Sequence, residues 1–290
     1  MNKFLSTLIV VLIVAIAAAG GLYWWQLRTL GPSGKNVAVP VATAPAPTAS
    51  SAAPPAEPAI QFPIDPAAAE KAALPSLATS DTYFAGAVGA LVPRNDVLKF
   101  LQLDKLAIRV VATVDNLARP HAAPALWPVN PTPGRFTTAQ AGAAPTTISA
   151  ANSQRYTLLV RFIESVDTTK AVALYVGAYP LFQQAYEELG YPRRYFNDRL
   201  VAVADHLLAT PAARDGLAVK LTEVKGPIAA ARPWVRYEFS DAALESLSSG
   251  QKIMLRAGPD NQARLKVKLR EIRGQIAGAA VAKPGDAARQ

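Results

Sequence analysis

Apolar side chains recur at helical spacing in the middle of the chain, from Asp167 to Thr210. Alternating four- and three-residue steps place five of them in one stripe along a helix. They are Tyr175, Tyr179, Phe182, Tyr186 and Leu189. A neighbouring apolar row makes this helix hydrophobic on most sides, which is typical of a helix buried by its neighbours. The segment therefore predicts the centre of a helical core.

Local signals divide this segment into two helices. Asp167 is a residue type that caps a helix N-terminus, and Gly190 followed by Pro192 is typical of a helix end. A second helix is expected over residues 193–209. Pro180 falls inside the first helix, where it removes a backbone donor and is expected to cause a kink.

The preceding part of the chain also has helical spacing. Residues 77–117 predict two or three helices, the last one capped by Asp104. The β-branched cluster at residues 108–114 leaves a strand open as an alternative. Residues 119–145 are rich in proline and predict a long irregular connection whose two large aromatic residues pack onto the core. A further helix is expected to begin near Ser149.

The pattern of apolar and polar residues changes after the central helices. Residues 217–224 and 234–239 alternate apolar and polar side chains, which predicts a small antiparallel β-hairpin. A last helical region follows at residues 250–276. The fold class is therefore expected to be mainly α (α+β), with a helical globular domain over residues 76–278 and a frayed C-terminal tail at residues 279–290.

The N-terminus has the pattern of a membrane anchor. Residues 4–25 form 22 nearly uninterrupted apolar positions, and Tyr23, Trp24 and Trp25 stand at their far end. A helix of that length spans about 33 Å, enough for a hydrocarbon core of about 30 Å. We expect a transmembrane anchor over residues 1–28. A cleaved signal peptide is the alternative, because three alanines at residues 17–19 resemble a cleavage site.

A low-complexity segment follows the anchor. Residues 29–75 are dominated by proline, alanine, serine, threonine and valine, as in VPVATAPAPTASSAAPPAEPA. Such a composition cannot build a core, so it predicts a disordered, semi-stiff linker. The linker would hold the domain away from the bilayer.

The amino-acid composition excludes several kinds of functional site and suggests a class of partner. The chain has no cysteine, which excludes disulfides, thiolate nucleophiles and cysteine zinc sites. The formal net charge is +9, which favours acidic polymers or anionic lipid as partners. Four cations near the C-terminus are candidates for a basic binding face, with a solvated helix face as the alternative. They are Arg264, Lys266, Arg270 and Arg273.

Phosphate loops, dinucleotide fingerprints, nucleophile elbows and metal-binding helices are absent from the sequence. No metal site or cofactor is expected. Glu164 followed by Ser165 resembles the Glu-Ser pair of lytic transglycosylases, in which a glutamate acts as acid and then base. The stripe tyrosines Tyr175, Tyr179 and Tyr186 are a second candidate site, as the lining of a ligand groove. Core packing is the favoured interpretation of these rings.

Several longer segments carry a family resemblance. They are YPLFQQAYEELGYPRRYFNDRLVAVADHLLATP, with ATVDNLARP and ALWPVNP before it and SSGQKIMLRAGPDNQARLKVKLREIR after it. With these segments the chain resembles a proteobacterial membrane-anchored family catalogued as domain of unknown function 3014. The resemblance implies an N-terminal anchor, a variable linker and one shared domain. It brings no catalytic residues.

These features lead to one expected function. The chain is expected to be a single-pass protein of the bacterial inner membrane, held in the bilayer by residues 4–25, with its C-terminal domain in the periplasm. The domain is expected to be non-enzymatic and to bind or scaffold an envelope protein or an acidic wall polymer. No nucleic-acid partner is expected. The alternative is a peptidoglycan-directed lyase or hydrolase with Glu164 as its acid/base.

Overall fold

The computed structural model describes residues 59–64, 73–222 and 235–278. The expected anchor at residues 1–28, the linker up to residue 58 and the tail from residue 279 lie outside these described residues. Within them, no helix combines the length and the apolar character needed to cross a bilayer.

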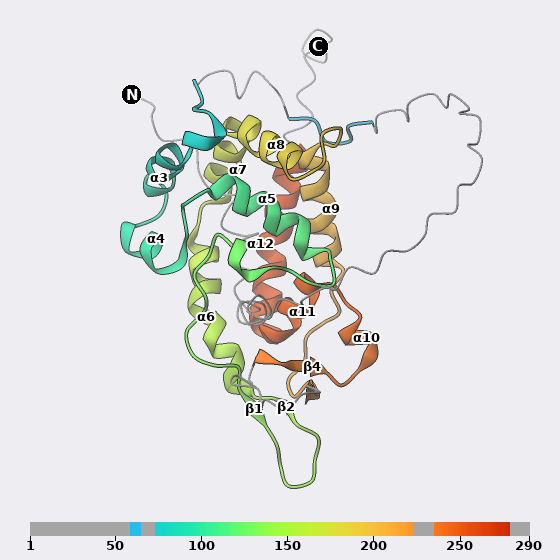
Figure 1. Cartoon of the computed structure of the whole chain (residues 1–290). Coiled ribbons are helices and arrows are strands. Elements are labelled where there is room, and N and C mark those ends of the chain that lie inside the picture. The colour runs from blue at the N-terminus through green and yellow to red at the C-terminus, as the bar shows by residue number, and fades with distance from the viewer. Residues whose placement is uncertain (1–58, 65–72, 223–234, 279–290) are drawn as a thin grey trace, which may run out of the picture.

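The described residues are mainly helical, as the sequence predicted, and Figure 1 labels most of these elements. The helices are α3 (Asp81–Gly89), α4 (Arg94–Phe100), α5 (Leu106–Leu117), α6 (Ala150–Ser165), α7 (Thr168–Gly177), α8 (Tyr179–Glu188), α9 (Phe196–Leu208), α10 (Ala242–Glu245), α11 (Ser249–Arg256) and α12 (Pro259–Gly278). Two 3-10 turns and four short strands complete the list: η2 (Leu77–Thr79), η3 (Pro124–Leu126), β1 (Thr138–Ala139), β2 (Thr147–Ile148), β3 (Val219–Leu221) and β4 (Tyr237–Phe239).

Two helices organise the packing. α12 runs through the middle of the bundle and contacts α6, α7, α9 and α11, while α5 packs on α8, α9 and α11 (Figure 1). α12 takes this central position because four apolar residues along it are buried, namely Leu265, Leu269, Ile272 and Ile276. In the sequence, this region was singled out for its basic residues, and its buried apolar residues were not predicted.

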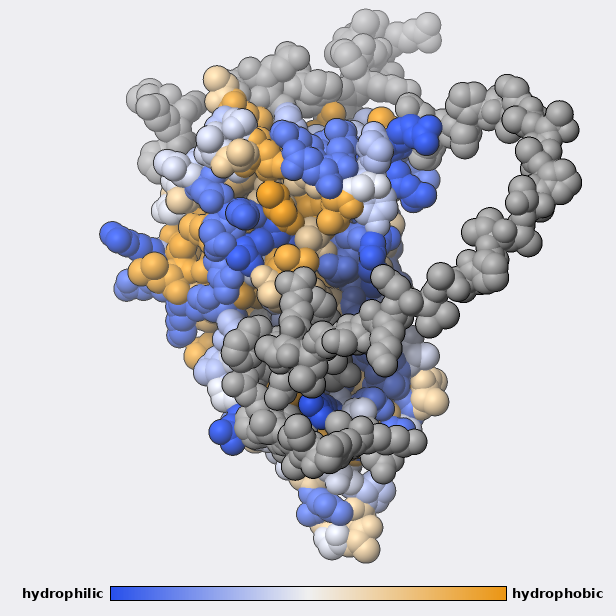
Figure 2. Space-filling model, in the orientation of Figure 1, coloured by the Kyte–Doolittle hydropathy of each residue, from blue (hydrophilic) through white to orange (hydrophobic). Residues whose placement is uncertain are grey.

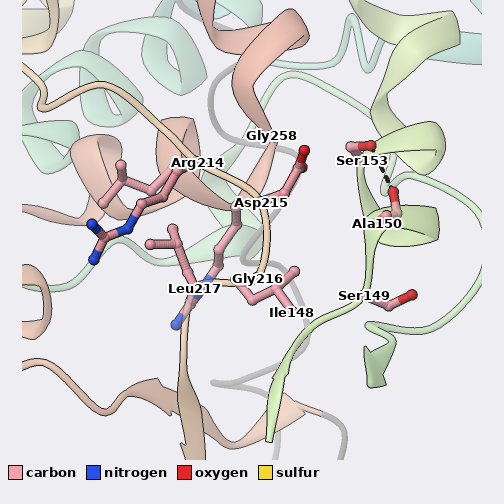
Figure 3. Close-up of a pocket in the computed structure, with 11 residues that line it drawn as sticks. Ile148, Ser149, Ala150, Ser153, Arg214, Asp215, Gly216, Leu217 and Gly258 are labelled. Carbon is pink, nitrogen blue, oxygen red and sulfur yellow. Dashed lines mark hydrogen bonds between the residues drawn. The ribbon is translucent and has the colours of Figure 1, made fainter. Parts of the chain in front are cut away.

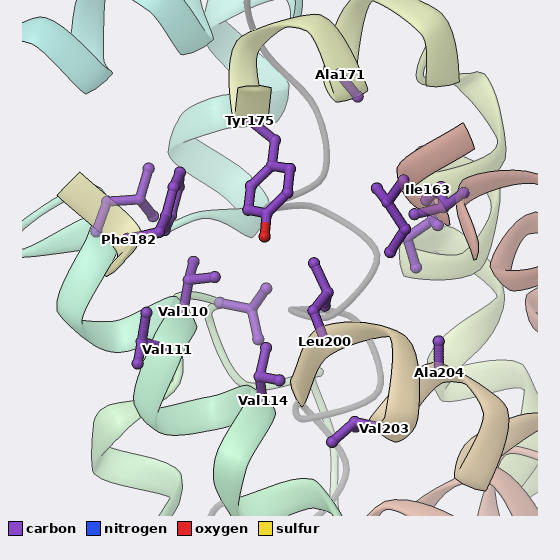
Figure 4. Close-up of a cluster of buried hydrophobic side chains, with 14 of the residues drawn as sticks. Val110, Val111, Val114, Ile163, Ala171, Tyr175, Phe182, Leu200, Val203 and Ala204 are labelled. Carbon is purple, nitrogen blue, oxygen red and sulfur yellow. The ribbon is translucent and has the colours of Figure 1, made fainter. Parts of the chain in front are cut away.

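The aromatic stripe lies in the core. Tyr175 and Tyr186 are among the largest fully buried side chains, together with Phe182 and Phe196. Figure 4 shows the Tyr175 ring among side chains of neighbouring helices, close to Val114 and Leu200. The prediction that residues 167–210 belong to the centre of the helical core is therefore confirmed.

The first central helix is interrupted at Ala178, two residues before Pro180. The sequence predicted one kinked helix, whereas the structure has two helices, α7 ending at Gly177 and α8 beginning at Tyr179. Pro180 occupies the first turn of α8, where a missing N–H costs nothing because the first N–H groups of a helix lack intrahelical partners. The kink prediction was wrong for this reason.

The β-branched segment before residue 117 is helical. α5 covers the whole cluster, so the strand alternative does not apply. Lys105 stands at the N-cap in a left-handed conformation with φ 51°, and it makes no side-chain cap. Asp104, the predicted cap, instead accepts a hydrogen bond from Arg109 Nη2 at 2.6 Å. The capping prediction was wrong because α5 begins at Leu106, which places Asp104 one residue before the N-cap position.

Two small antiparallel sheets lie at one end of the bundle (Figure 1). β3 pairs with β4 with Val219 opposite Phe239, which confirms the predicted hairpin pairing. Residues 223–234, between these strands, lie outside the described residues. β1 pairs with β2, a pairing that the sequence did not predict. The backbone N–H of Ile148 donates to the carbonyl of Leu217 at 2.9 Å, so the two sheets are joined.

Part of the expected linker is packed on the domain. Residues 59–64 fall inside the linker predicted at residues 29–75, yet Ile64 is only 5% exposed and belongs to the main core. Phe62 packs against the same core. Two apolar side chains in an otherwise proline- and alanine-rich segment supply the contact.

One face of the molecule mixes hydrophobic and hydrophilic residues (Figure 2). On the face shown in Figure 2, hydrophobic residues gather over α4 and α5 and hydrophilic residues border them. Three large apolar side chains exposed on this part of the chain are Leu98, Ile108 and Leu126. Net charge therefore does not describe the surface by itself, and the placement of each cation matters.

Candidate functional site

A polar cluster surrounds one buried carboxylate, that of Asp115 on α5. Its side chain is 4% exposed, and the neighbouring Val114 and Leu117 are fully buried. Arg119 Nη2 donates to Oδ2 of Asp115 at 2.5 Å, and Arg199 Nε donates to Oδ1 at 3.2 Å. Each carboxylate oxygen thus meets a cation, which is how a charge is tolerated at this degree of burial.

Three helices position this cluster. Arg119 follows Asp115 by one turn at the end of α5, and Arg199 projects from α9 and also donates from Nη2 to the Asp115 carbonyl at 3.0 Å. The hydroxyl of Tyr191, between α8 and α9, donates to Asp115 Oδ2 at 3.2 Å and accepts from Arg119 Nη2 at 2.6 Å. The Tyr191 ring stacks on Tyr186 of α8 with centroids 4.6 Å apart. The two guanidinium groups therefore have fixed orientations.

The cluster is open to solvent on its cationic side. One carboxylate and two guanidinium groups give it a formal charge of +1. The Arg119 side chain is 51% exposed and the Arg199 side chain 29% exposed. Neither Nη1 atom makes a hydrogen bond to another described residue. Oriented guanidinium groups with free N–H groups suit a carboxylate or a phosphate.

The sequence interpretation missed Asp115, Arg119, Tyr191 and Arg199. A signal was present, because Asp115 interrupts the apolar side of α5 and an arginine follows one turn later. A carboxylate at a buried helix position needs partners. No sequence pattern indicated that Arg199 of α9, 84 residues further along the chain, would be the second partner.

Glu164, the acid/base candidate, lies on α6 and faces α12. Arg264 donates from Nε and Nη2 to its two oxygens, at 2.7 Å for the Nε contact. Both side chains are partly exposed, at 33% and 37%. The hydrogen bond to Glu164 raises the pKa of Arg264 above its usual value. Because both carboxylate oxygens accept from one guanidinium, neither is free to exchange a proton with a sugar, and the geometry gives no support to a role as general acid.

Most cations of the predicted basic face have intramolecular partners. Arg264 pairs with Glu164 as described. Lys266 donates to the carbonyl of Thr210 at 2.5 Å, and Arg273 donates from Nε and Nη2 to Asp205 at 2.9 and 3.0 Å. Arg270 is exposed and has no acidic partner among the described residues, and its charge, after burial, helps to lower the pKa of the neighbouring Lys266. These cations fasten α12 to α6 and α9 rather than form a free basic row.

The three candidate tyrosines are enclosed. Tyr175, Tyr179 and Tyr186 are 1%, 7% and 2% exposed. The Tyr175 hydroxyl donates to Asn197 Oδ1 at 3.1 Å, and the Tyr179 hydroxyl donates to Gln183 Oε1 at 2.9 Å. Their rings pack on each other edge-to-face with centroids 5.6 Å apart. The structure therefore places them as core residues and brings none of them to a groove.

A small pocket lies at the N-terminus of α6 (Figure 3). Its polar lining includes Ser149, Ser153, Arg214 and Asp215, and the Ser153 hydroxyl donates to Ala150 O at 2.8 Å. The pocket also borders on Arg256, whose Nη2 donates to the Tyr237 carbonyl at 2.9 Å and whose Nε is buried without a partner. Burial lowers the pKa of Arg256. None of the site residues predicted from the sequence lines this pocket.

A serine and a histidine meet at the start of α11. Ser248 caps this helix by accepting the N–H of Gln251 at 3.3 Å, and Gln251 Oε1 accepts the Ser248 N–H in return. His206 Nε2 lies 2.8 Å from the Ser248 hydroxyl oxygen. Burial, followed by the charge of Arg199, lowers the pKa of His206. This is a capping box with a histidine attached, and it connects α9 to α11.

Other polar residues of the C-terminal segment hold distant backbone groups together. Asn261 Nδ2 donates to the carbonyl of Ser153 at 2.8 Å, and Gln262 accepts from Ala213 N and donates to Pro211 O. Both side chains are 4% exposed. Buried amides in such roles satisfy backbone groups that loops would otherwise leave unpaired. The polar residues of this segment are thus explained by the fold.

The comparisons with known proteins identify a family and no individual relative. Within the described ranges, no group of three or more histidine, aspartate or glutamate side chains is placed to hold a metal ion. No curated protein and no solved structure matches the chain. One family model matches residues 106–273, more than half of the chain, and the match contains Asp115, Arg119, Tyr191 and Arg199. The chain therefore belongs to the family described as "Protein of unknown function (DUF3014)".

Proposed function

We propose that this chain is a membrane-tethered, non-enzymatic protein of the cell envelope whose helical domain binds an anionic partner on the extracytoplasmic side. Residues 4–25 would hold it in the bacterial inner membrane and the proline- and alanine-rich linker would set its distance from the bilayer. The partner is an acidic wall polymer or an envelope protein with an acidic surface.

One observation carries the binding part of the proposal. Arg119 and Arg199 are oriented by a carboxylate that is itself buried, and they keep free N–H groups toward solvent. Because their side chains are already ordered, an anion that binds them does not have to supply the entropy of fixing two long side chains. Binding of a carboxylate or phosphate group at this place is therefore favoured over binding at a mobile lysine.

The distribution of the other cations supports the same site. Along α12, Arg264, Lys266 and Arg273 have intramolecular partners, so an anion would have to displace a carboxylate or a carbonyl to reach them. At the Asp115 cluster the cations outnumber the carboxylate by one. The partner expected from the net charge of +9 is therefore assigned to the Asp115 cluster instead of the predicted basic row.

A binding experiment tests this assignment. The full-length chain in detergent is mixed with purified peptidoglycan sacculi carrying their acidic polymers and, separately, with poly-L-glutamate as a model anion. The variant Arg119→Gln is expected to bind at least tenfold more weakly than the wild type. Arg270→Gln removes the same charge from an exposed residue that has no acidic partner among the described residues, and it is expected to bind within about twofold of the wild type.

The two variants distinguish binding at the Asp115 cluster from a general effect of net charge on binding. Equal weakening by Arg119→Gln and Arg270→Gln would mean that only net charge matters and would contradict the site. Unchanged binding by Arg119→Gln would remove the cluster from the proposal. The tether is tested independently by membrane fractionation and by protease treatment of spheroplasts, where a cytosolic full-length chain would contradict it.

A further inference from the structure

A short segment without helix or strand structure, residues 59–64, lies on the helical domain and is held by its backbone. The N–H groups of Gln61 and Phe62 donate to the two carboxylate oxygens of Asp198, at 3.0 and 2.8 Å. The N–H of Ile64 donates to the hydroxyl oxygen of Tyr195 at 2.7 Å. Asn197 Nδ2 donates to the Phe62 carbonyl at 2.8 Å. Backbone groups of this segment are thus recognised by three polar side chains at the start of α9, those of Tyr195, Asn197 and Asp198.

Two side chains of the segment supply apolar contacts. Ile64 is buried at 5% exposure, and Phe62 packs on the core beneath the guanidinium group of Arg273, whose Cζ lies 5.9 Å from the ring centroid. Pro63 stands between them and is exposed. A proline has no N–H to satisfy and favours an extended backbone. The pattern is an aromatic and an aliphatic anchor separated by one proline.

The receiving surface is positioned by the core. Asn197 is fully buried, and its Oδ1 accepts from the Tyr175 hydroxyl while its backbone N–H donates to the Tyr179 hydroxyl. Its Nδ2 also faces the carbonyl of Ile276 at 3.4 Å. Arg273 is held by Asp205. The groups that contact the segment are therefore oriented by α7, α9 and α12.

We propose that this surface, formed by Tyr195, Asn197, Asp198 and Arg273, is a peptide-binding groove, and that residues 59–64 are its ligand within the same chain. Backbone hydrogen bonds supply affinity, and pockets for the two anchors supply specificity, as in other sites that bind extended peptides. The ligand class is an aromatic-Pro-aliphatic peptide without helix or strand structure. A segment of six residues loses considerable backbone entropy on docking, so the bound state is exchangeable with a competing peptide of the same pattern.

The groove has a consequence for the tether, which rests on the function proposed above. Docking of residues 59–64 brings the end of the linker to the α9 side of the domain. Release would free the six residues from 59 to 64, which at about 3.3–3.6 Å each add about 20 Å of reach when extended. A competing peptide on a partner would then lengthen the tether as it binds.

A peptide-binding experiment tests the groove. In the full-length chain in detergent, the double variant Phe62→Ala/Ile64→Ala weakens the resident segment and leaves the groove unchanged. A fluorescein-labelled peptide with the sequence of residues 59–64, AIQFPI, is titrated in and its anisotropy is measured. The double variant is expected to bind it at least tenfold more tightly than the wild type. A scrambled peptide, and the double variant carrying Asp198→Asn in addition, are expected to bind at least tenfold more weakly.

Hydrogen exchange of the wild-type chain supplies a second measurement. The amides of Gln61, Phe62 and Ile64 are expected to be protected and to lose that protection when excess AIQFPI peptide is added, while amides of α5 do not change. Three outcomes would overturn the proposal. They are a folded double variant that does not bind the peptide, a double variant that does not fold because the segment is a core element, and a dimer in which the segment occupies the partner copy. Anion binding through Arg119, measured on the wild-type chain, does not depend on any of them.

Discussion

His206 Nε2 lies 2.8 Å from the hydroxyl oxygen of Ser248, the residue that caps α11. The hydroxyl also accepts the N–H of Gln251, and the Gln251 side chain returns to the Ser248 N–H and to the carbonyl of His206. The end of α9 and the start of α11 are therefore joined by one hydrogen-bonded unit. Since this unit contains a titratable ring, the junction responds to pH.

Stability is expected to fall as the pH drops through the region just below 6.5. Burial and the charge of Arg199 lower the pKa of His206 from 6.5, so the unfolded chain takes up a proton at a higher pH than the folded chain does. The free energy of unfolding then falls with falling pH until the folded ring is protonated as well. His206→Gln keeps a nitrogen near Nε2 and removes this contribution. Chemical denaturation of both proteins at pH 7.5 and 5 measures the difference.

The other histidine provides the control for this pH effect. His121 is exposed, and His121→Gln is expected to leave the pH dependence of the wild type unchanged. A wild-type chain and a His206→Gln variant with the same loss of stability between the two pH values would contradict the prediction.

Removing the buried charge of Asp115 is expected to destabilise the fold. Asp115→Asn leaves Arg119 and Arg199 without their counter-charge, and a loss of about 2 kcal/mol is expected. This is less than the roughly 3–5 kcal/mol of a fully buried pair, because both guanidinium groups reach solvent. Glu188→Gln, a change of the same kind at an exposed position, is expected to cost less than about 0.5 kcal/mol. Urea denaturation measures both, and equal effects would show that the cluster does not stabilise the fold.

Gly250 permits the close approach of α11 to α5 and α9. A Cβ atom there would lie 2.6 Å from Leu207 Cδ2 and 2.9 Å from the backbone oxygen of Leu117, so α11 would have to move. Gly250→Ala is expected to cost about 2 kcal/mol. At Gly274 a Cβ atom meets nothing within 4 Å, and Gly274→Ala is expected to stabilise α12 by about 0.5–1 kcal/mol. The midpoint temperature of thermal unfolding should therefore fall for Gly250→Ala and rise for Gly274→Ala. A shift of both variants in the same direction would contradict the packing argument.

Tyr175 and Tyr179 are expected to resist ionisation until the fold opens. Burial raises the pKa of both phenols well above 10.0. Because the folded pKa exceeds the unfolded one, this contribution to stability is fully present below about pH 10 and is lost as the pH rises further. Absorbance at 295 nm should therefore rise in two stages, the second together with the loss of the circular dichroism signal.

The variant Tyr175→Phe checks the assignment of that second stage. The second rise in absorbance should shrink by the contribution of one phenol, while the first stage stays the same. Ionisation of all nine tyrosines before any loss of circular dichroism would contradict the prediction.

The sequence by itself determined the helical character of the domain and much of its core. Regular spacing identified Tyr175, Phe182 and Tyr186 as one buried stripe, because apolar residues at steps of three and four share a helix face. Asp167 was recognised as a cap from its residue type and position, and its Oδ1 accepts the N–H of Lys170 at 3.1 Å. Sequence rules predicted the stripe and the cap correctly because both depend on residues that are close together in the chain. They were insufficient at Pro180, since a proline fits both a kinked helix and the first turn of a new one.

Only the tertiary structure decided which charges are free and which residues form a site. Arg270 and Arg273 share a helix face in the sequence pattern, yet Arg273 is held by Asp205, 68 residues earlier in the chain, and Arg270 faces solvent. Asp115 gains Arg199 across 84 residues, and Phe62 reaches Asp198 across 136. A carboxylate and a guanidinium attract through space and not along the chain. Their pairing is therefore set by how the helices pack, which no spacing in the sequence expresses.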